Sequence, residues 1–169
     1  NDIIKKKILL MDEKITLFSK TDYQSRLNET SGYTRIKGGS RGKNNKIFFP
    51  QIKKTEKFMF DSGFDGEVHI TKKIFNKLSK QVPYRKFVNK KGKFMYFFEK
   101  TTLIWENIII PDCEVVYIPT LKLNLIGNKL MRRFNFVLAY GPSDSTLTFP
   151  SYNDLYIQPI KNFNNTKST

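Results

Sequence analysis

Short apolar stretches, separated by turn-forming residues, are the feature that most restricts how this chain can fold. The clearest of them occupy 47–49, 57–60, 103–105, 108–110, 114–118 and 136–140. Stretches of this length fit β-strands and are too short for most helices, and their close spacing is typical of a closed or sandwiched sheet. Alanine, the residue that most favours helices, occurs only at position 139. We therefore predict a mainly β fold.

Two segments have a helical pattern. Residues 71–80 place Ile74, Phe75 and Leu78 on one helical face, and Thr71 can cap the first turn. Residues 128–134 are long enough for two further turns. The predicted fold class is therefore all-β, meaning mainly β with two short helices.

The strands on either side of a turn suggest hairpins. Residues 87–98 have aromatic and apolar arms around a turn that contains Gly92. Residues 103–110 form a second hairpin-like pair, and further strands are expected at 14–18 and 146–149. The chain has 169 residues, which suits one domain with a core of its own.

Composition also suggests how the chain is divided. Residues 28–45 are polar and rich in glycine, so we expect a flexible loop or linker there. We predict an N-terminal extension or linker at 1–45 that could add a strand, a main domain at 46–160 and a frayed tail at 161–169. No apolar run is long enough to span a membrane, and the compartment cannot be read from the sequence.

The chain is strongly basic but offers few kinds of reactive side chain. Its 30 basic and 15 acidic residues give a formal charge of +15, spread along the chain, which favours acidic partners in general. His69 and Cys113 are the single histidine and the single cysteine, so an intrachain disulfide and a Cys/His zinc site are excluded. We therefore expect no metal or other cofactor, and the catalytic options narrow to carboxylates.

One carboxylate has a setting that suits catalysis. Three bulky apolar residues at 58–60 lead into Asp61-Ser62-Gly63. A buried strand can deliver a carboxylate to its end, and the glycine lets the backbone turn sharply and pass close to another segment. Two such carboxylates held together share a proton, so that one activates a water molecule while the other protonates the substrate carbonyl. Alone, Asp-Ser-Gly is a common turn.

The residues around this motif, and a second motif later in the chain, extend the pattern. The motif lies in the run 60–70, which a predicted helix follows. Later in the chain, Leu125-Ile126-Gly127 opens a short predicted helix that precedes the strand-like 135–140. In this order and spacing, the two segments resemble the bacterial branch of the retropepsin-like aspartic proteases. The resemblance covers residues 46–150. It implies a retropepsin-like acid protease β-barrel with one lobe per chain, acting as an aspartic endopeptidase on a peptide or protein substrate.

The resemblance also implies roles for individual residues. Asp61 would be the catalytic acid and base, while Ser62 would hydrogen-bond across a dimer interface and Gly63 would allow close backbone approach. A second group would pack behind the catalytic loop: Leu125, Ile126 and Gly127. The 87–98 hairpin would be the flap that closes over substrate, with these residues at its tip: Lys91, Gly92, Lys93 and Phe94.

The sequence departs from the family pattern at two positions of the motif. Ser62 replaces the commoner threonine and keeps the hydroxyl group. Asp65 adds a second acid near Asp61, and we expect its side chain to be solvated. Residues 1–45 have no counterpart in the minimal family domain.

The mechanism needs two aspartates, and no other Asp in the chain is followed by Ser or Thr and then Gly. We therefore expect the second Asp61 to come from the other subunit of a homodimer. The alternative is a second lobe that this fragment lacks. Two other functions stay open: a catalytically inactive protease-like dimerisation domain, and a basic β module that binds single-stranded nucleic acid. Nucleic acid is the less favoured partner, because a solvated linker and a hairpin packed on the core explain the same residues.

Overall fold

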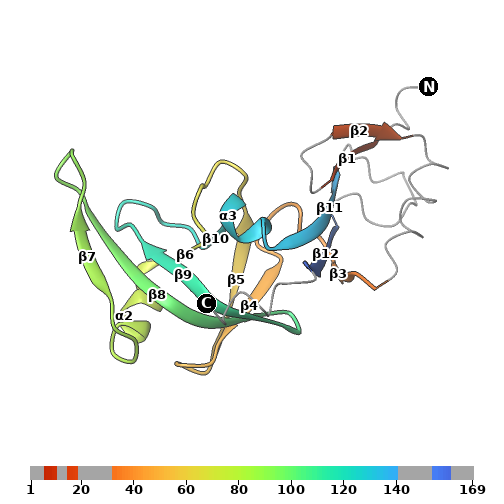
Figure 1. Cartoon of the computed structure of the whole chain (residues 1–169). Coiled ribbons are helices and arrows are strands. Elements are labelled where there is room, and N and C mark those ends of the chain that lie inside the picture. The colour runs from red at the N-terminus through yellow and green to blue at the C-terminus, as the bar shows by residue number, and fades with distance from the viewer. Residues whose placement is uncertain (1–5, 11–14, 19–31, 141–153, 161–169) are drawn as a thin grey trace. The chain divides into compact units, whose positions relative to one another are not determined.

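The computed structural model describes residues 6–10, 15–18, 32–140 and 154–160 (Figure 1). The chain divides into two compact units, one made of 1–44 with 132–169 and the other of 45–131. These units are defined by compactness and not by independent folding. The domain boundaries at 45 and 160 therefore stay a prediction. No helix in the described ranges combines the length and apolar character that crossing a lipid bilayer requires.

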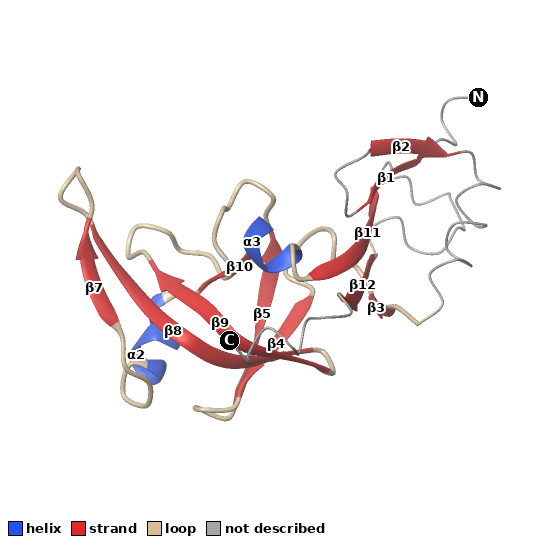
Figure 2. Ribbon diagram, in the orientation of Figure 1, coloured by secondary structure: helices blue, strands red, loops and turns tan. Residues whose placement is uncertain are grey.

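The 45–131 unit is built on a closed sheet. Its strands run in the order β4-β5-β10-β6-β9-β8-β7. Because β4 also pairs with β8, six of these strands form a barrel, and β7 extends the sheet beyond it (Figure 2). The bounds are β4 Asn45–Phe49, β5 Lys54–Phe60, β6 Val68–His69, β7 Arg85–Val88, β8 Phe94–Trp105, β9 Ile108–Tyr117 and β10 Leu125–Ile126.

Alternation of apolar and polar residues explains the barrel core. Along β4, Asn45, Ile47 and Phe49 are buried while Lys46 is exposed, as expected for a strand with one face inward. The largest fully buried side chains of this unit come from three strands, β4, β5 and β8: Phe49, Phe58, Phe98 and Trp105. Burial of such rings contributes on the order of 2 kcal/mol each, so the aromatic residues make a large contribution to the stability of the barrel.

Two helices lie in this unit. α2, Lys72–Leu78, buries Ile74 and Leu78 as the pattern predicted, but the Thr71 side chain forms no capping hydrogen bond. The backbone N–H of Thr71 instead donates to Asn124 Oδ1 at 2.9 Å. α3, Asn128–Met131, is shorter than predicted because Phe134 already begins a strand.

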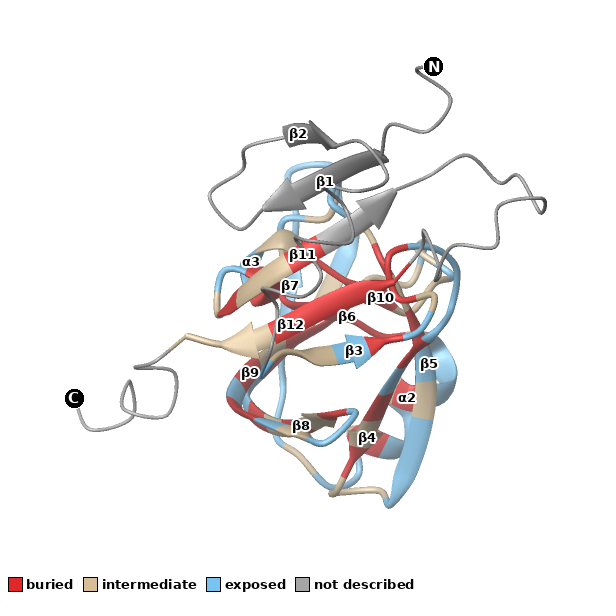
Figure 3. Ribbon diagram, turned by 90° about the vertical axis from the view of Figure 1, so that its right-hand side faces the viewer, coloured by how far each residue is buried: buried red, intermediate tan, exposed pale blue. Residues whose placement is uncertain are grey.

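The other unit contains a second sheet, with strand order β2-β1-β11-β12-β3. Its strands are β1 Lys6–Leu10, β2 Ile15–Phe18, β3 Thr34–Ile36, β11 Phe134–Tyr140 and β12 Leu155–Pro159. All of its neighbouring strands pair antiparallel. β12 was not foreseen, and the first three of its residues are buried (Figure 3).

The expectation of a flexible loop at 28–45 is wrong for part of that segment. β3 pairs with β12, and Arg35 Nε lies 2.5 Å from Asp154 Oδ2. Asp154 is fully buried, and its Oδ1 accepts a hydrogen bond from the Gly38 N–H at 2.9 Å. These contacts order a segment whose composition alone suggested a linker. The strand predicted at 146–149 and the tail predicted at 161–169 lie outside the described residues.

The predicted fold class is confirmed in the described ranges. The structure is mainly β, closes one sheet into a barrel and contains the short helices α2 and α3. Both predicted hairpins form: β7 pairs with β8, and β8 pairs with β9 around Trp105 and Ile108.

Candidate active site

The carboxylate singled out by the sequence lies at the end of a buried strand. β5 ends at the buried Phe60, and Asp61 follows with a half-buried side chain. β10 runs parallel to β5, with Ile126 opposite Phe60, and the Asp61 N–H donates to the Ile126 carbonyl at 2.9 Å. The backbone of Asp61 is therefore held in place because it continues directly from β5 and is hydrogen-bonded to β10.

The turn after Asp61 also fixes the carboxylate. The Gly63 N–H donates to Asp61 Oδ1 at 2.8 Å, and the Phe64 N–H donates to the Asp61 carbonyl at 3.1 Å. Ser62 and Gly63 are exposed, and the Ser62 carbonyl accepts a hydrogen bond from the Asn128 side-chain amide. The loop thus presents an oriented and partly accessible carboxylate.

A very close backbone approach holds this loop against the start of α3. The Gly127 N–H donates to the Glu67 carbonyl, and the Asn128 N–H to the Phe64 carbonyl, both at 2.9 Å. A Cβ atom on Gly127 would lie 2.1 Å from the Gly66 carbonyl oxygen and 2.5 Å from that of Phe64. Position 127 therefore requires glycine because there is no room for a side chain.

The structure brings most of the predicted site residues together. Asp61, Ser62 and Gly63 form one loop, and Leu125, Ile126 and Gly127 form the buried segment that pairs with the strand before it. Asp65 is exposed, as expected. The catalytic roles of these residues are predictions from the sequence.

The predicted flap residues lie elsewhere in the same unit. The tip of the β7–β8 hairpin is a turn in which Asn89 Oδ1 accepts hydrogen bonds from the N–H groups of Lys91 and Lys93, each at 2.9 Å. Gly92 has φ +76° and open space around it. All four predicted flap residues are exposed, and Figure 1 shows the hairpin tip and the loop after β5 as separate projections.

A buried histidine supports the site and was not predicted to do so. His69 is fully buried, with Nδ1 at 2.7 Å from the Leu123 carbonyl, and its Nε2 accepts the Ile118 N–H at 3.0 Å. These partners fit a neutral ring with its proton on Nδ1. Burial lowers the pKa of His69 below its usual 6.5, although the two backbone hydrogen bonds oppose this shift. His69 therefore anchors the segment that leads into β10.

Asn124 was also missed, although it joins three segments. It accepts a hydrogen bond from the Thr71 N–H on Oδ1 and donates from Nδ2 to the Lys57 carbonyl at 3.2 Å. Its own carbonyl accepts the Met59 N–H at 3.0 Å. No sequence signal marks such a residue, because its partners are backbone atoms distant in the chain.

In the described part of the chain, no group of three or more His, Cys, Asp and Glu side chains is arranged to hold a metal ion. Cys113 is buried and not in a disulfide. In the loop after β5, the side chain of Asp61 is half-buried and that of Asp65 is exposed.

Comparison with known proteins finds a similarity of structure and none of sequence family. No protein-family model matches the chain, and no curated protein matches it. Among solved structures, the chain is similar to the crystal structure of a retropepsin-like aspartic protease from Rickettsia conorii, with 16% sequence identity and a TM-score of 0.44. The match covers 75% of this chain and 90% of that one. A likeness at this level carries no information on the chemistry of the site.

Proposed function

We propose that this chain is an aspartic endopeptidase in which two Asp61 carboxylates, one from each of two subunits, activate a water molecule. The observation that carries the proposal is the setting of Asp61. Its backbone is bonded to β10, its carboxylate is oriented by the Gly63 N–H, and its side chain remains partly accessible. A carboxylate fixed in this way is suited to acid and base chemistry, because little reorganisation is needed during reaction.

The reaction follows from two carboxylates that share one proton. The ionised Asp61 takes a proton from water, whose oxygen attacks the carbonyl carbon of the scissile peptide bond. The protonated Asp61 of the other subunit gives its proton to the carbonyl oxygen. The first Asp61 then gives the proton it took from water to the amide nitrogen. As the carbon–nitrogen bond breaks, one hydroxyl group of the tetrahedral intermediate returns a proton to the second Asp61, so that a carboxylic acid and an amine leave and the pair again shares one proton. General acid–base catalysis of this kind contributes about 10²–10⁴-fold.

Two subunits are proposed because one chain supplies one such carboxylate. Asp65 is exposed, and Glu67 is buried with Oε1 accepting the Glu114 N–H at 3.0 Å. Neither shares the position of Asp61 at the end of β5. The exposed Ser62 and Gly63 leave the loop accessible to the same loop of a second copy, around a two-fold axis. A second lobe in a longer protein would serve the same purpose.

In the proposed enzyme, the β7–β8 hairpin is the flap. The residues assigned to its tip from the sequence are Lys91, Gly92, Lys93 and Phe94. They are exposed at the end of a two-stranded projection, and a Cβ at Gly92 would meet no atom within 4 Å. In the proposed enzyme this hairpin covers the bound peptide and excludes water from the pair of carboxylates.

Replacement of Asp61 tests the proposal. Asp61→Asn keeps the shape of the side chain and the acceptor for the Gly63 N–H, but it cannot serve as a base. Peptide cleavage should fall by about 10²-fold or more. Asp65→Asn is the matched control, because Asp65 is an exposed acid four residues along the same loop, and it should cleave like the parent. Equal cleavage by the Asp61→Asn variant would contradict the proposal, whereas a folded, dimeric and inactive parent would favour the dimerisation domain.

A further inference from the structure

The β7–β8 hairpin concentrates positive charge on an edge of the sheet. Residues 85–94 contain five Lys or Arg and no acidic residue. Arg85 is paired with Glu99. The remaining four, Lys86, Lys90, Lys91 and Lys93, are exposed and form no ion pair with any described residue. Their mutual repulsion is relieved only by solvent or by a negatively charged partner.

The same hairpin exposes apolar side chains. Phe87 and Phe94 are each 44% exposed and Val88 is 59% exposed. The side chains alternate between the two faces of β7. One face carries Arg85 over the Phe87 ring at 5.5 Å, and the other carries Lys86 over the Phe94 ring at 3.9 Å. Each face therefore offers one cation beside one aromatic ring.

The backbone of β7 is also available for pairing. β7 ends the strand order of its sheet, and in the described part of the chain it pairs only with β8. The Asn89 N–H donates to the Lys93 carbonyl, which makes 89 and 93 a hydrogen-bonded pair. Hydrogen-bonded pairs alternate with non-hydrogen-bonded pairs along antiparallel strands, so the backbone groups of Arg85 and Phe87 bond to β8. The backbone N–H and C=O groups of Lys86 and Val88 therefore point toward the open edge. An exposed edge of this kind accepts an added strand.

A hollow lies at the base of the same strand. It has a volume of about 310 Å³ and is lined by Pro83, Tyr84, Arg85, Phe97, Glu99 and Lys100. It lies beside the Arg85 end of β7.

We propose that the β7–β8 hairpin binds an extended acidic peptide segment by strand addition to β7. In the proposed endopeptidase this segment belongs to the substrate, and that part of the inference rests on the proposed function. The segment recognised has acidic side chains interspersed with apolar ones, because each face of β7 pairs a cation with an aromatic ring. Peptide is favoured over nucleic acid because the alternating N–H and C=O groups of the open edge match the backbone of a peptide strand and not a sugar-phosphate backbone, and because Lys86 already covers a face of Phe94.

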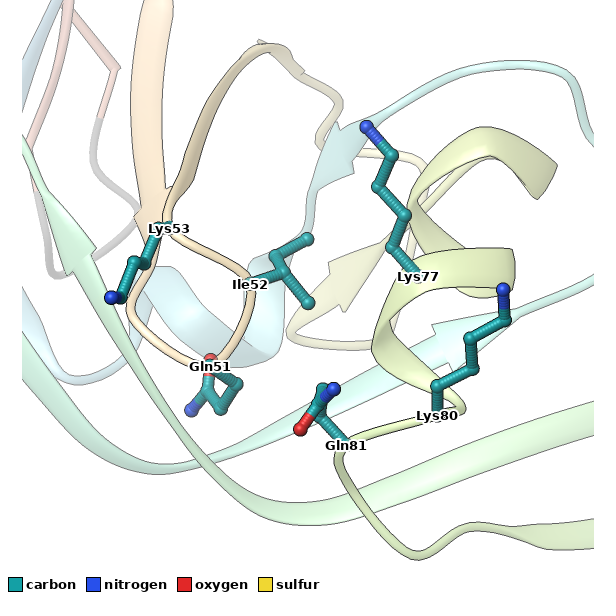
Figure 4. A pocket seen from close by; sticks show the side chains of 6 residues that line it. All are labelled: Gln51, Ile52, Lys53, Lys77, Lys80 and Gln81. Carbon is teal, nitrogen blue, oxygen red and sulfur yellow. The ribbon is translucent and has the colours of Figure 1, made fainter.

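A second basic site provides a matched control. Lys53, Lys77 and Lys80 line an open pocket of about 340 Å³ with Gln51, Ile52 and Gln81, between the β4–β5 turn and the end of α2 (Figure 4). These three lysines are exposed like those of the hairpin, but no open strand edge is among the residues that line the pocket. Reversal of their charge changes the field of the whole protein as much as reversal of three hairpin lysines does.

Binding tests the inference without any need for cleavage. The full-length chain carrying Asp61→Asn is titrated with a fluorescent peptide of alternating glutamate and apolar residues, and with the same peptide in which glutamine replaces glutamate. The acidic peptide should bind about tenfold tighter or more. Lys86→Glu/Lys91→Glu/Lys93→Glu should remove that preference, while Lys53→Glu/Lys77→Glu/Lys80→Glu should keep affinity within about twofold.

A single substitution tests the strand addition itself. Val88→Pro removes an outward N–H without breaking the bonds to β8, since proline is tolerated on edge strands. It should weaken peptide binding by about tenfold while circular dichroism stays unchanged.

Three binding results would overturn the inference: equal binding of the glutamine peptide, an equal loss in the pocket variant, or hairpin-dependent binding of a single-stranded oligonucleotide with none of the acidic peptide. Cleavage by the parent without acidic preference would overturn this inference alone. Acidic binding without cleavage would overturn the proposed function alone.

Discussion

The loop after β5 and the tip of the β7–β8 hairpin are both turns that contain glycine, but they are held in opposite ways. The loop at Asp61 is tied to β10 and α3 through backbone hydrogen bonds, with a carbonyl oxygen 2.1 Å from where a Gly127 Cβ would be. At the hairpin tip, a Cβ on Gly92 would meet no atom within 4 Å, and the turn is closed by hydrogen bonds to Asn89 from neighbouring residues of the same turn. The contrast supports the proposed roles of the two turns, because a catalytic group needs fixed geometry whereas a flap needs freedom to move.

Among the substitutions that test this contrast, Gly127→Ala should have the largest effect on stability. Gly127→Ala forces a Cβ into the carbonyls of Phe64 and Gly66, and backbone atoms cannot move aside cheaply. We expect a loss of about 3 kcal/mol or more in the free energy of unfolding, at the upper end for overpacking. Urea unfolding measures it. A variant as stable as the parent would show that the loop is not held as tightly as described.

The second largest effect on stability is expected at His69, the histidine that anchors the segment before β10. His69→Gln leaves the Ile118 N–H or the Leu123 carbonyl with a poorer partner, which should cost about 1–3 kcal/mol. Chemical denaturation at neutral pH tests this, with a surface change such as Lys80→Gln as the control. An unchanged midpoint would mean that His69 is not a support.

His69 also predicts a pH dependence whose sign is fixed. Because burial lowers its pKa in the folded state, the unfolded chain binds the proton more readily. The stabilisation is therefore complete above pH 6.5, the unfolded value, and is lost as pH falls from there through the folded pKa. The difference in unfolding free energy between the parent and His69→Gln should shrink on acidification. A difference that stays constant or grows would contradict the neutral, buried ring.

A smaller effect is expected at the other turn. Gly92→Ala places a side chain at φ +76° but in open space, so only backbone strain is added. The loss should be about 1 kcal/mol, clearly less than for Gly127→Ala. If both substitutions cost the same, the contrast between a clamped loop and an open tip is wrong.

The smallest effect is expected for the ion pair at the base of the hairpin. Arg85 and Glu99 are 64% and 53% exposed, so solvent screens their attraction. Glu99→Gln should change stability by less than about 0.5 kcal/mol. Thermal unfolding at low and high salt measures it, and a loss above about 1 kcal/mol would show a role beyond the exposed pair.

Local patterns allowed much of this structure to be predicted from the sequence. The apolar run ending at Asp61, the hairpin around Gly92 and the helix with Ile74 and Leu78 all follow from residues near one another in the chain. Such features depend on periodicity and turn chemistry, which a single sequence displays.

The parts that could not be predicted depend on contacts between distant segments. β3 is ordered by the ion pair between Arg35 and Asp154, which are 119 positions apart. The parallel pairing of β5 with β10 joins two segments that no local pattern connects. His69 and Asn124 bond to backbone atoms, which leave no signature in side-chain sequence.

The central claim is that each active site needs Asp61 from two chains, and a mixing experiment tests it directly. Parent and Asp61→Asn chains are unfolded together, refolded at varied ratios and assayed for peptide cleavage at constant total protein. If a dimer needs both carboxylates, activity follows the square of the parent fraction, because dimers with one substituted chain are inactive. Activity that falls in simple proportion to the parent fraction would mean that a single chain holds a complete site.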